Sequence, residues 1–140
     1  MIKKFFTKIL LSLLSLKYNN FHPLVFTKGN LTVGKNVYVG LFSEVNATKG
    51  EVILGDNCDI ASFVSINVAD SHKKTIEESS EIERGKIIFE NNVFVGSHCF
   101  IGGDVYVGHH SVIAAGTILI GKDVVIPPYS LVVGNPYQVK

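Results

Sequence analysis

The chain has 140 residues, of which 46% are apolar, a size and composition typical of one folded domain with one core. Its net charge of +1 gives no reason to expect nucleic acid or another polyanion as a partner. Cys58 and Cys99 are too few for a secreted disulfide framework or a four-ligand zinc site. Two thiols are typical of a reducing cytoplasm, where we expect the protein to act.

Residues 1–20 predict an N-terminal amphipathic helix. Apolar residues recur at nearly helical spacing, and the longest unbroken apolar run is three residues, too short for a membrane span. The Lys-then-Leu order is that of a secretory signal, but no small-x-small cleavage site follows. Two interpretations stay open: the helix packs on its own or a neighbouring subunit, or residues 1–17 lie peripherally on the inner membrane face. The apolar positions are Ile2, Phe5, Phe6, Ile9, Leu10, Leu13, Leu14 and Leu16, and the basic ones are Lys3, Lys4, Lys8 and Lys17.

From Val33 onward the sequence repeats every six residues. Twelve hexads align, from VGKNVY at 33–38 to one beginning at Leu119, with one early slip and a longer break at 69–86. The first residue is Val, Leu, Ile or Phe in all twelve, and the second is Gly or Ala in eight. The fifth is Val, Ser, Cys or Thr in nine. The exceptions, which fall beside a slip or the break, are Lys49, Asp70 and Asp123.

A six-residue period fits neither a helix nor a simple strand, and it predicts a short strand followed by a corner, repeated. The first and fifth residues point inward, and Gly beside the inward residue relieves crowding at the corner. Three hexads form one triangular coil of about 18 residues, and successive coils hydrogen-bond at about 4.8 Å. Four to five coils fit, so residues 21–140 predict an all-β solenoid roughly 20 Å long.

The break at 69–86, ADSHKKTIEESSEIERGK, carries nine of the 25 Lys, Arg, Asp and Glu residues of the chain. Unpaired charges are too costly to bury inside the solenoid, so this segment must project as a loop. A flat-sided solenoid has no deep cleft, and long loops in compact domains are often functional. The sequence therefore predicts one projecting loop, with His72 near its start.

The stretch from Gly85 to Pro136 reads GKIIFENNVFVGSHCFIGGDVYVGHHSVIAAGTILIGKDVVIPPYSLVVGNP. Its hexads and closing P-P and G-N-P motifs resemble the hexapeptide-repeat acyltransferases, in particular the branch of galactoside, maltose and xenobiotic O-acetyltransferases. The repeats cover about three-quarters of the chain, and the resemblance implies a left-handed parallel β-helix. Phe94 stands where this branch has Trp. Gln138 stands where it has Lys or Arg, which removes a positive charge expected near the coenzyme A phosphates.

The same resemblance implies that the loop carries a catalytic histidine, and His72 occupies that place. Acetyl transfer to a hydroxyl needs a base that takes the proton during attack, and a neutral imidazole suits this task near neutral pH. The base needs a partner that fixes its tautomer. Glu83 matches a Glu that supports the His in the galactoside and maltose enzymes, and Asp70 is its local competitor. We favour Glu83.

Further site residues are implied by the resemblance. The backbone N–H near Ser97 is the candidate donor to the oxyanion, and Ser97 and Ala115 match positions along the acetyl-CoA channel. Lys122 is the candidate phosphate contact, although the repeat slips by one residue at 119–120. The candidates for acceptor binding are Asn46 and Phe94.

In this branch three prisms pack side by side, and the His of one subunit faces acetyl-CoA held partly by the next. We therefore expect a homotrimer with sites between subunits, acetyl-CoA as co-substrate and no metal. The expected reaction is O-acetylation of a sugar hydroxyl, in a cell-surface polysaccharide or its precursor.

Three other functions stay open. A metal-dependent relative such as a γ-class carbonic anhydrase needs three His around one ion. His98, however, is 11 and 12 residues from His109 and His110, not the 18 of one coil. A non-enzymatic β-helix scaffold would keep the repeats without needing the His-bearing loop. N-acetylation of a nucleotide-linked amino sugar would use the same co-substrate.

Overall fold

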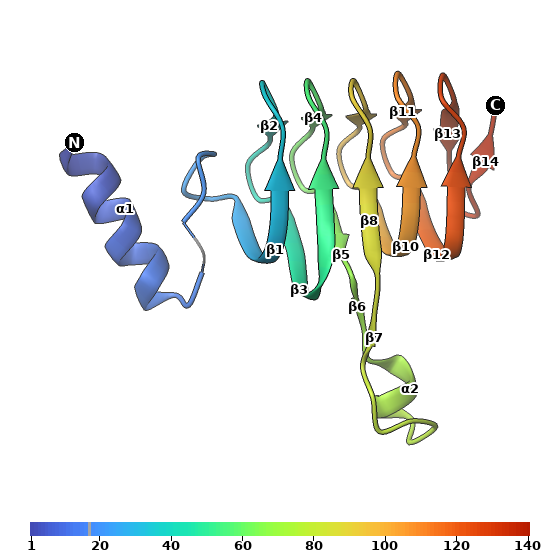
Figure 1. The fold of residues 1–140 in the computed structure, drawn as a ribbon, viewed down its shortest axis with the longest axis horizontal. Helices are drawn as coiled ribbons and strands as arrows, with labels where there is room; N and C mark the ends of the chain where they lie inside the picture. The colour runs from blue at the N-terminus through green and yellow to red at the C-terminus, as the bar shows by residue number, and fades with distance from the viewer. Residues whose placement is uncertain (17) are drawn as a thin grey trace.

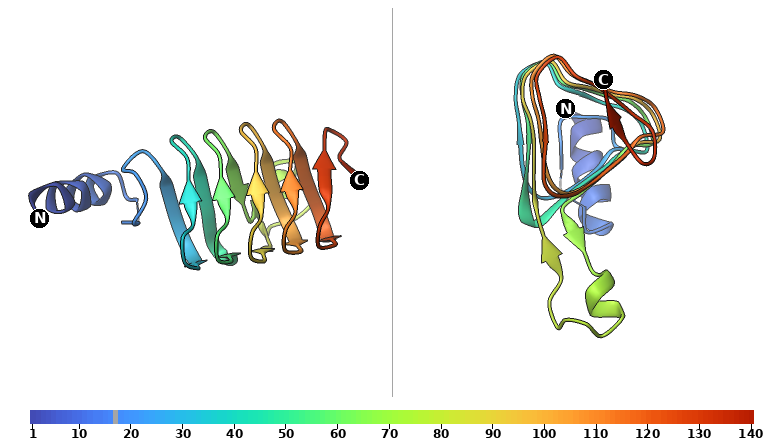
Figure 2. Two further views of the ribbon diagram at one scale, coloured as in Figure 1. Left: turned by 90° about the horizontal axis from the view of Figure 1, so that it is seen from above. Right: turned by 90° about the vertical axis from the view of Figure 1, so that its right-hand side faces the viewer.

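The computed structural model describes residues 1–16 and 18–140 as a triangular prism of stacked strands with a helix at one end (Figure 1, Figure 2). Lys17, one of the four lysines of the predicted amphipathic segment, lies outside the described residues. One sheet contains β1 (Phe26–Val33), β3 (Glu44–Leu54), β5 (Ser65–Asn67), β8 (Lys86–Phe89), β10 (Phe100–Val107) and β12 (Ile118–Ile126). A second sheet contains β2 (Tyr38–Val39), β4 (Asp59–Ile60), β9 (Phe94–Val95), β11 (Val112–Ile113), β13 (Leu131–Val133) and β14 (Gln138–Val139).

The first sheet wraps two faces of the prism because β1, β3, β10 and β12 each continue across a corner. Face 1 consists of the first halves of these strands with β5, and face 2 of their second halves with β8. Face 3 is the second sheet. Each face stacks five parallel strands, with β14 added antiparallel on face 3, so the chain makes five coils. This confirms the solenoid predicted from the repeats and the left-handed parallel β-helix implied by the family resemblance.

Strand register shows where the repeat is interrupted. The usual offset is 18 residues, as between Phe94 and Val112, which is three hexads per coil. Between β1 and β3 the offset grows from 18 to 21, so three extra residues lie within 48–51.

The second slip lies later than the predicted position at 119–120. The offset between β10 and β12 is still 18 at Gly121 and becomes 19 at Val124, so the extra residue lies at Lys122–Asp123. Leu119 is fully buried. An extra residue beside it would turn the following side chains to the wrong face, whereas a corner absorbs the insertion.

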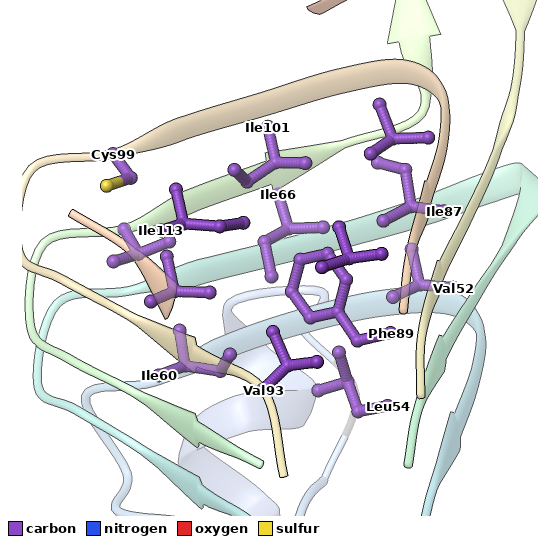
Figure 3. Packing of buried hydrophobic residues seen from close by; sticks show 14 of the residues in the cluster. Val52, Leu54, Ile60, Ile66, Ile87, Phe89, Val93, Cys99, Ile101 and Ile113 are labelled. Carbon is purple, nitrogen blue, oxygen red and sulfur yellow. The ribbon is translucent and has the colours of Figure 1, made fainter. Parts of the chain in front are cut away.

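The inward positions of the hexads build the core (Figure 3). Eleven of the twelve first residues are buried, and the exception, Val33, lies in the first coil and is 39% exposed. The small polar residues at fifth positions bond to the backbone of the corner; the Ser43 hydroxyl, for example, donates to the Ala61 carbonyl at 2.8 Å. Phe89 is the largest fully buried side chain. The predicted inward positions therefore fill the prism.

All three corners carry residues in the left-handed backbone region, among them Lys49 and Asp123 at the corner between faces 1 and 2. Asn tolerates this region because its short side chain can bond locally, whereas Phe there is unusual. The corner between faces 1 and 3, called the Phe corner, stacks the rings of Phe42, Phe63 and His98 at centroid distances of 5.3 and 5.1 Å. The corner between faces 2 and 3 stacks Asn36, Asn57, Asn92, His110 and Tyr129, with φ from 53° to 61°.

The charged segment leaves the prism at the third corner, between faces 1 and 2, which we call the loop corner (Figure 2). Antiparallel strands β6 (Ala69–Asp70) and β7 (Glu83–Arg84) form its stem, and helix α2 (His72–Thr75) lies beyond them. The Arg84 guanidinium donates to the Thr48 carbonyl at 3.0 Å, which fastens the stem to a neighbouring coil.

Helix α1 (Ile2–Leu13) stands apart from the faces of the prism, beyond its first coil (Figure 1). It ends earlier than the predicted segment 1–20 because Ser15 has a φ of 56°, which a right-handed helix excludes. Among the described residues, no helix combines the length and hydropathy needed to cross a bilayer.

Candidate active site

The loop corner gathers a histidine, two carboxylates and two lysines. Asp70 and Glu83 face each other across the β6–β7 hairpin, and His72 begins α2 directly after the turn. One carboxylate oxygen of each acid and one ring nitrogen of His72 lie within 4.8 Å of one another. Lys73 comes from α2, and Lys122 from the slipped corner of β12 further along the prism.

His72 is held by Asp70. The Nδ1 atom of His72 lies 2.6 Å from Oδ1 of Asp70, and the same oxygen accepts the His72 backbone N–H at 2.9 Å. An ionised carboxylate only accepts, so Nδ1 carries the proton and Nε2 is left as the proton acceptor. The side chain of His72 is 57% exposed, so the ring is open to an incoming molecule. This is the arrangement that a general base requires.

The preference for Glu83 as the partner of His72 does not match this geometry. Oε1 of Glu83 accepts from Lys73 Nζ at 2.7 Å and lies 3.7 Å from Lys122 Nζ. Its carboxylate is thus engaged by two ammonium groups, whereas Asp70 is two residues from His72 and meets both its ring and its backbone. Within one chain, Asp70 orients the imidazole and Glu83 ties α2 to the stem and to β12.

The charges of this cluster are mutually stabilised. Hydrogen bonds from His72, first from its backbone N–H and then from its ring, hold the pKa of Asp70 below its ordinary value. The hydrogen bond from Lys73 lowers the pKa of Glu83, and the same bond raises the pKa of Lys73. Both acids therefore stay ionised at neutral pH. The two ammonium groups beside Glu83 repel a further cation, so the cluster suits proton transfer better than metal binding.

Ser97 and Ala115 lie elsewhere, at the Phe corner. They differ by 18 residues and stack on adjacent coils, where the Gly116 N–H donates to the Ser97 carbonyl at 2.9 Å. Face 1 separates this corner from the loop corner. In one chain, these two residues and His72 therefore lie at opposite edges of face 1.

The two candidates for acceptor binding are also far apart. Asn46 lies on face 1 in β3, beside the loop corner, and its Oδ1 accepts the Thr48 N–H at 3.1 Å. Phe94 lies in β9 on face 3, which is the face opposite the loop corner, and is 40% exposed. One chain can bring Asn46 near His72 but cannot bring Phe94 there.

Two features of this region escaped the sequence reasoning. The sequence analysis gave Lys73 no role, and only the fold shows that it reaches Glu83 across the hairpin. The Phe corner was also missed, although Phe42 and Phe63 occupy the same place in successive coils, 21 residues apart. The Phe corner could have been predicted because both residues are the fourth of their hexads.

Two hollows of the surface lie away from His72. One of about 420 Å³ is lined by Glu90, Asn91, Asn92, His109 and His110 at the corner between faces 2 and 3. Another of about 340 Å³ lies beside the first coil and includes Tyr18, Phe21 and Val37 in its lining. Neither hollow therefore includes the histidine or the two carboxylates of the loop corner.

Known proteins share part of this sequence and this fold. Galactoside O-acetyltransferase of Escherichia coli K12 is 35% identical over 120 residues, which cover 84% of this chain and 57% of that protein. The chain thus spans little more than half the length of this curated relative. No protein-family model matches the sequence.

Several solved structures are also similar to this chain in sequence and fold. A galactoside acetyltransferase in complex with coenzyme A matches at 32% identity and a TM-score of 0.67, over 86% of this chain and 59% of that one. The polySia-specific acetyltransferase NeuO matches at 28% identity and a TM-score of 0.69, with the same coverage of 86% and 59%. AntD, an N-acyltransferase of Bacillus cereus bound to a dTDP-amino sugar and coenzyme A, covers 84% of this chain and 66% of its own. Its TM-score is 0.73, but at 18% identity it supports the fold alone. From its hexads, its β-helix and these relatives, the chain belongs to the hexapeptide-repeat acyltransferases, in the branch of galactoside O-acetyltransferase.

Proposed function

We propose that this protein transfers the acetyl group of acetyl-CoA to a sugar hydroxyl, in a cell-surface polysaccharide or its precursor, with His72 as general base. The observation that carries the proposal is the pair formed by Asp70 and His72 on the projecting loop. With Nδ1 engaged at 2.6 Å, the only lone pair left on the ring is at Nε2. A base of this kind contributes roughly 10²- to 10⁴-fold to the rate.

The reaction needs one proton to move twice. The acceptor hydroxyl donates its proton to Nε2 of His72 while its oxygen attacks the thioester carbonyl carbon. The carbon–sulfur bond then breaks, and the coenzyme A sulfur takes the proton back from the imidazolium. Asp70 stays ionised throughout and stabilises the positive charge on the ring.

Direct transfer fits the state of the two thiols. Cys58 and Cys99 are buried in the core, 1% and 2% exposed. Burial raises the pKa of both thiols, so they stay protonated and are poor nucleophiles. Neither thiol is available to form an acyl-enzyme, so the acetyl group passes directly from donor to acceptor.

Face 1 and the Phe corner suit a long, thin ligand such as the pantetheine arm. A side-chain carbon added at Gly116 would have no neighbour within 4 Å among the described residues, so the backbone beside Ala115 is open to close approach. Phe100, Ile118 and Ile120 add partly or fully exposed apolar surface on the neighbouring strands of face 1. Lys122 supplies a cation at the loop corner, the far edge of face 1.

The scattered positions of the candidate residues favour a site between subunits. Ser97 and Ala115 lie across face 1 from His72, and Phe94 lies on the opposite face. A second copy packed side by side would bring its own Phe corner or face 3 to the loop. This supports the expected homotrimer, in which one subunit supplies His72 and the next helps to hold acetyl-CoA.

The donor site can be tested without knowing the acceptor. Thermal unfolding is measured with acetyl-CoA, coenzyme A and a matched nucleotide that lacks the pantetheine arm. A ligand at 100 times its dissociation constant stabilises the native state by about 2.7 kcal/mol, enough to raise the melting temperature clearly. Absence of any shift at saturating ligand would favour the non-enzymatic scaffold. With binding established, hydroxyl and amino sugars are screened in parallel, which separates O- from N-acetylation.

The shared site has its own test. His72→Ala and Ala115→Asp are each expected to abolish activity, and they are co-expressed with different tags. If sites lie between subunits, mixed trimers contain some sites with neither change and regain part of the activity. If each site lies within one chain, mixing restores nothing.

A further inference from the structure

Helix α1 exposes an apolar face that none of the described residues covers. At about 100° per residue, these side chains occupy about half of the helix circumference. Each is at least 42% exposed, and Leu13 reaches 78%. The members of this face are Ile2, Phe5, Phe6, Ile9, Leu10, Leu13 and Leu14.

The opposite side of α1 is the one that its own chain engages. Leu11 follows Ile2 by nine residues, which puts the two on opposite sides of the helix. Leu11 is only 2% exposed, and Lys8 Nζ lies 5.0 Å from the ring centroid of Tyr18. The segment after the helix therefore lies along its back, and the apolar face is turned away from it. In Figure 1 and in the left view of Figure 2 the helix stands clear of the prism.

Charge is distributed unevenly along the chain. Residues 1–43 contain six Lys and no Asp or Glu, a net charge of +6. The remaining residues contain 13 − 6 = 7 basic and 12 acidic residues, a net charge of −5, which together restore the total of +1. Such asymmetry between parts of a chain is typical of contact with an anionic surface. On α1 itself the exposed charges are Lys3, Lys4 and Lys8.

We propose that α1 lies flat on a bilayer containing anionic phospholipid, with its apolar face among the acyl chains and its lysines at the headgroups. An apolar half, with only basic residues among the charged side chains of the helix, is the pattern of an interfacial helix. Twelve residues give about 18 Å of helix, well short of the roughly 30 Å of a hydrocarbon core, so it lies on the membrane rather than across it.

A second copy of α1 fits this surface less well. Helices that pair with each other use a narrow seam flanked by charges of both signs. Here the apolar face is about twice as wide as such a seam, and three neighbouring helices would gather nine lysines with no acidic partner on any of them. Lipid phosphates supply the missing negative charge.

The test is flotation of the full chain with phosphatidylcholine vesicles, with and without phosphatidylglycerol. Binding is expected only with phosphatidylglycerol, and it should weaken as salt rises. Exchanging Lys3, Lys4 and Lys8 for Gln should weaken binding by about fivefold per lysine, since each is worth about 1 kcal/mol near such a surface. The matched control exchanges three exposed lysines outside the helix, Lys49, Lys74 and Lys140, and should bind as before.

The apolar face is tested separately. Phe6→Gln with Leu13→Gln should reduce binding by about tenfold or more, while Ile76→Gln with Val125→Gln, exposed apolar positions elsewhere, should not. Unchanged thermal unfolding shows that each variant folds. The proposal is overturned if the chain floats with neither vesicle, or if the lysine variant binds like the parent. It is also overturned if the Phe6 and Leu13 variant changes only the oligomeric mass, which would make this face a subunit contact.

Discussion

The prism and the loop at 69–86 are built on opposite principles. In the prism every inward position repeats, each coil rests on the one before it, and nearly all first hexad residues are buried. The loop has no repeat; apart from the turn of α2, its structure depends on a two-residue ladder and a few ion pairs. We infer that the prism provides most of the stability and the loop provides the reactive groups. Substitutions in the loop should therefore leave the fold intact.

The largest effect that sharpens this contrast is expected from His72→Ala. Loss of the base should lower kcat by roughly 10²- to 10⁴-fold, measured as coenzyme A release with the acceptor found by screening. The melting temperature should stay within error because the side chain is 57% exposed. Lys74→Ala, from the same short helix, is the control. Equal losses of activity in both variants would mean that the loop acts only as a surface.

A core truncation should do the reverse. Phe89→Ala is expected to lower the free energy of unfolding by about 3–5 kcal/mol, because the ring is fully buried and the coil cannot collapse around the cavity. Phe94→Ala, on the exposed side of the next strand, should cost less than about 1 kcal/mol. Urea unfolding of both variants compares them directly. Equal losses of stability would mean that the position of a residue in its hexad does not determine its contribution to the free energy of unfolding.

Within the loop, the two acids should differ. Asp70→Asn removes the charged partner of the His72 ring and should lower kcat/KM by about 10- to 100-fold. Glu83→Gln keeps the size of the side chain but weakens its pair with Lys73, and should cost clearly less. The opposite order would show that Glu83 replaces Asp70 when substrates are bound.

The pH profile adds a second readout of the same pair. Because hydrogen bonds from His72 lower the pKa of Asp70, this carboxylate stays ionised well below neutral pH. Protonation of Asp70 should therefore not limit activity until the pH lies below the ordinary range of a carboxyl group. In Asp70→Asn the charge is absent at every pH, so the loss of kcat/KM relative to the parent should be constant across the neutral range. A loss that changed with pH in this range would mean that Asp70 gains its proton there.

The smallest effect is expected at the corners of the prism. Asn92 has a φ of 61°, and Asn92→Ala should cost about 1–2 kcal/mol because Ala is strained in the left-handed region. Asn92→Gly should cost less, since Gly adopts this region freely. Thermal unfolding of the two variants measures the difference. Equal losses would mean that the side chain matters here and not the backbone angle.

The contrast also explains what could be predicted. The six-residue period fixed the inward residues, the coil length and the place of the loop, because periodic burial leaves a periodic sequence. No such signal decides whether Asp70 or Glu83 is the partner of His72, because the sequence has a carboxylate on each side of this histidine. Only the geometry of the hairpin shows that Lys73 pairs with Glu83. The second slip was placed three residues early, at 119–120 and not at 122–123, for a related reason. Its neighbours Leu119 and Ile120 are both apolar, and only strand register shows which one points inward.

The N-terminal segment could be predicted only in part. Its apolar spacing predicted a helix, but spacing cannot tell whether the apolar face meets protein. Exposure of Phe6 and Leu13 on one side, and burial of Leu11 on the other, distinguishes the two sides. Residues 1–20 as a unit, and residues 21–140 as the acyltransferase domain, stay predictions.

Strand β14 has a consequence for the whole molecule. A stack of parallel coils is a template, and the unpaired edge of its last coil could accept the first coil of another molecule and so grow into a filament. β14 runs antiparallel on β13, pairing Val139 with Val132, and Lys140 exchanges two backbone hydrogen bonds with Leu131. This reversed strand occupies the edge of face 3 and presents the wrong direction to an incoming parallel coil. At this edge the reversed strand therefore hinders the addition of a parallel coil from a second molecule.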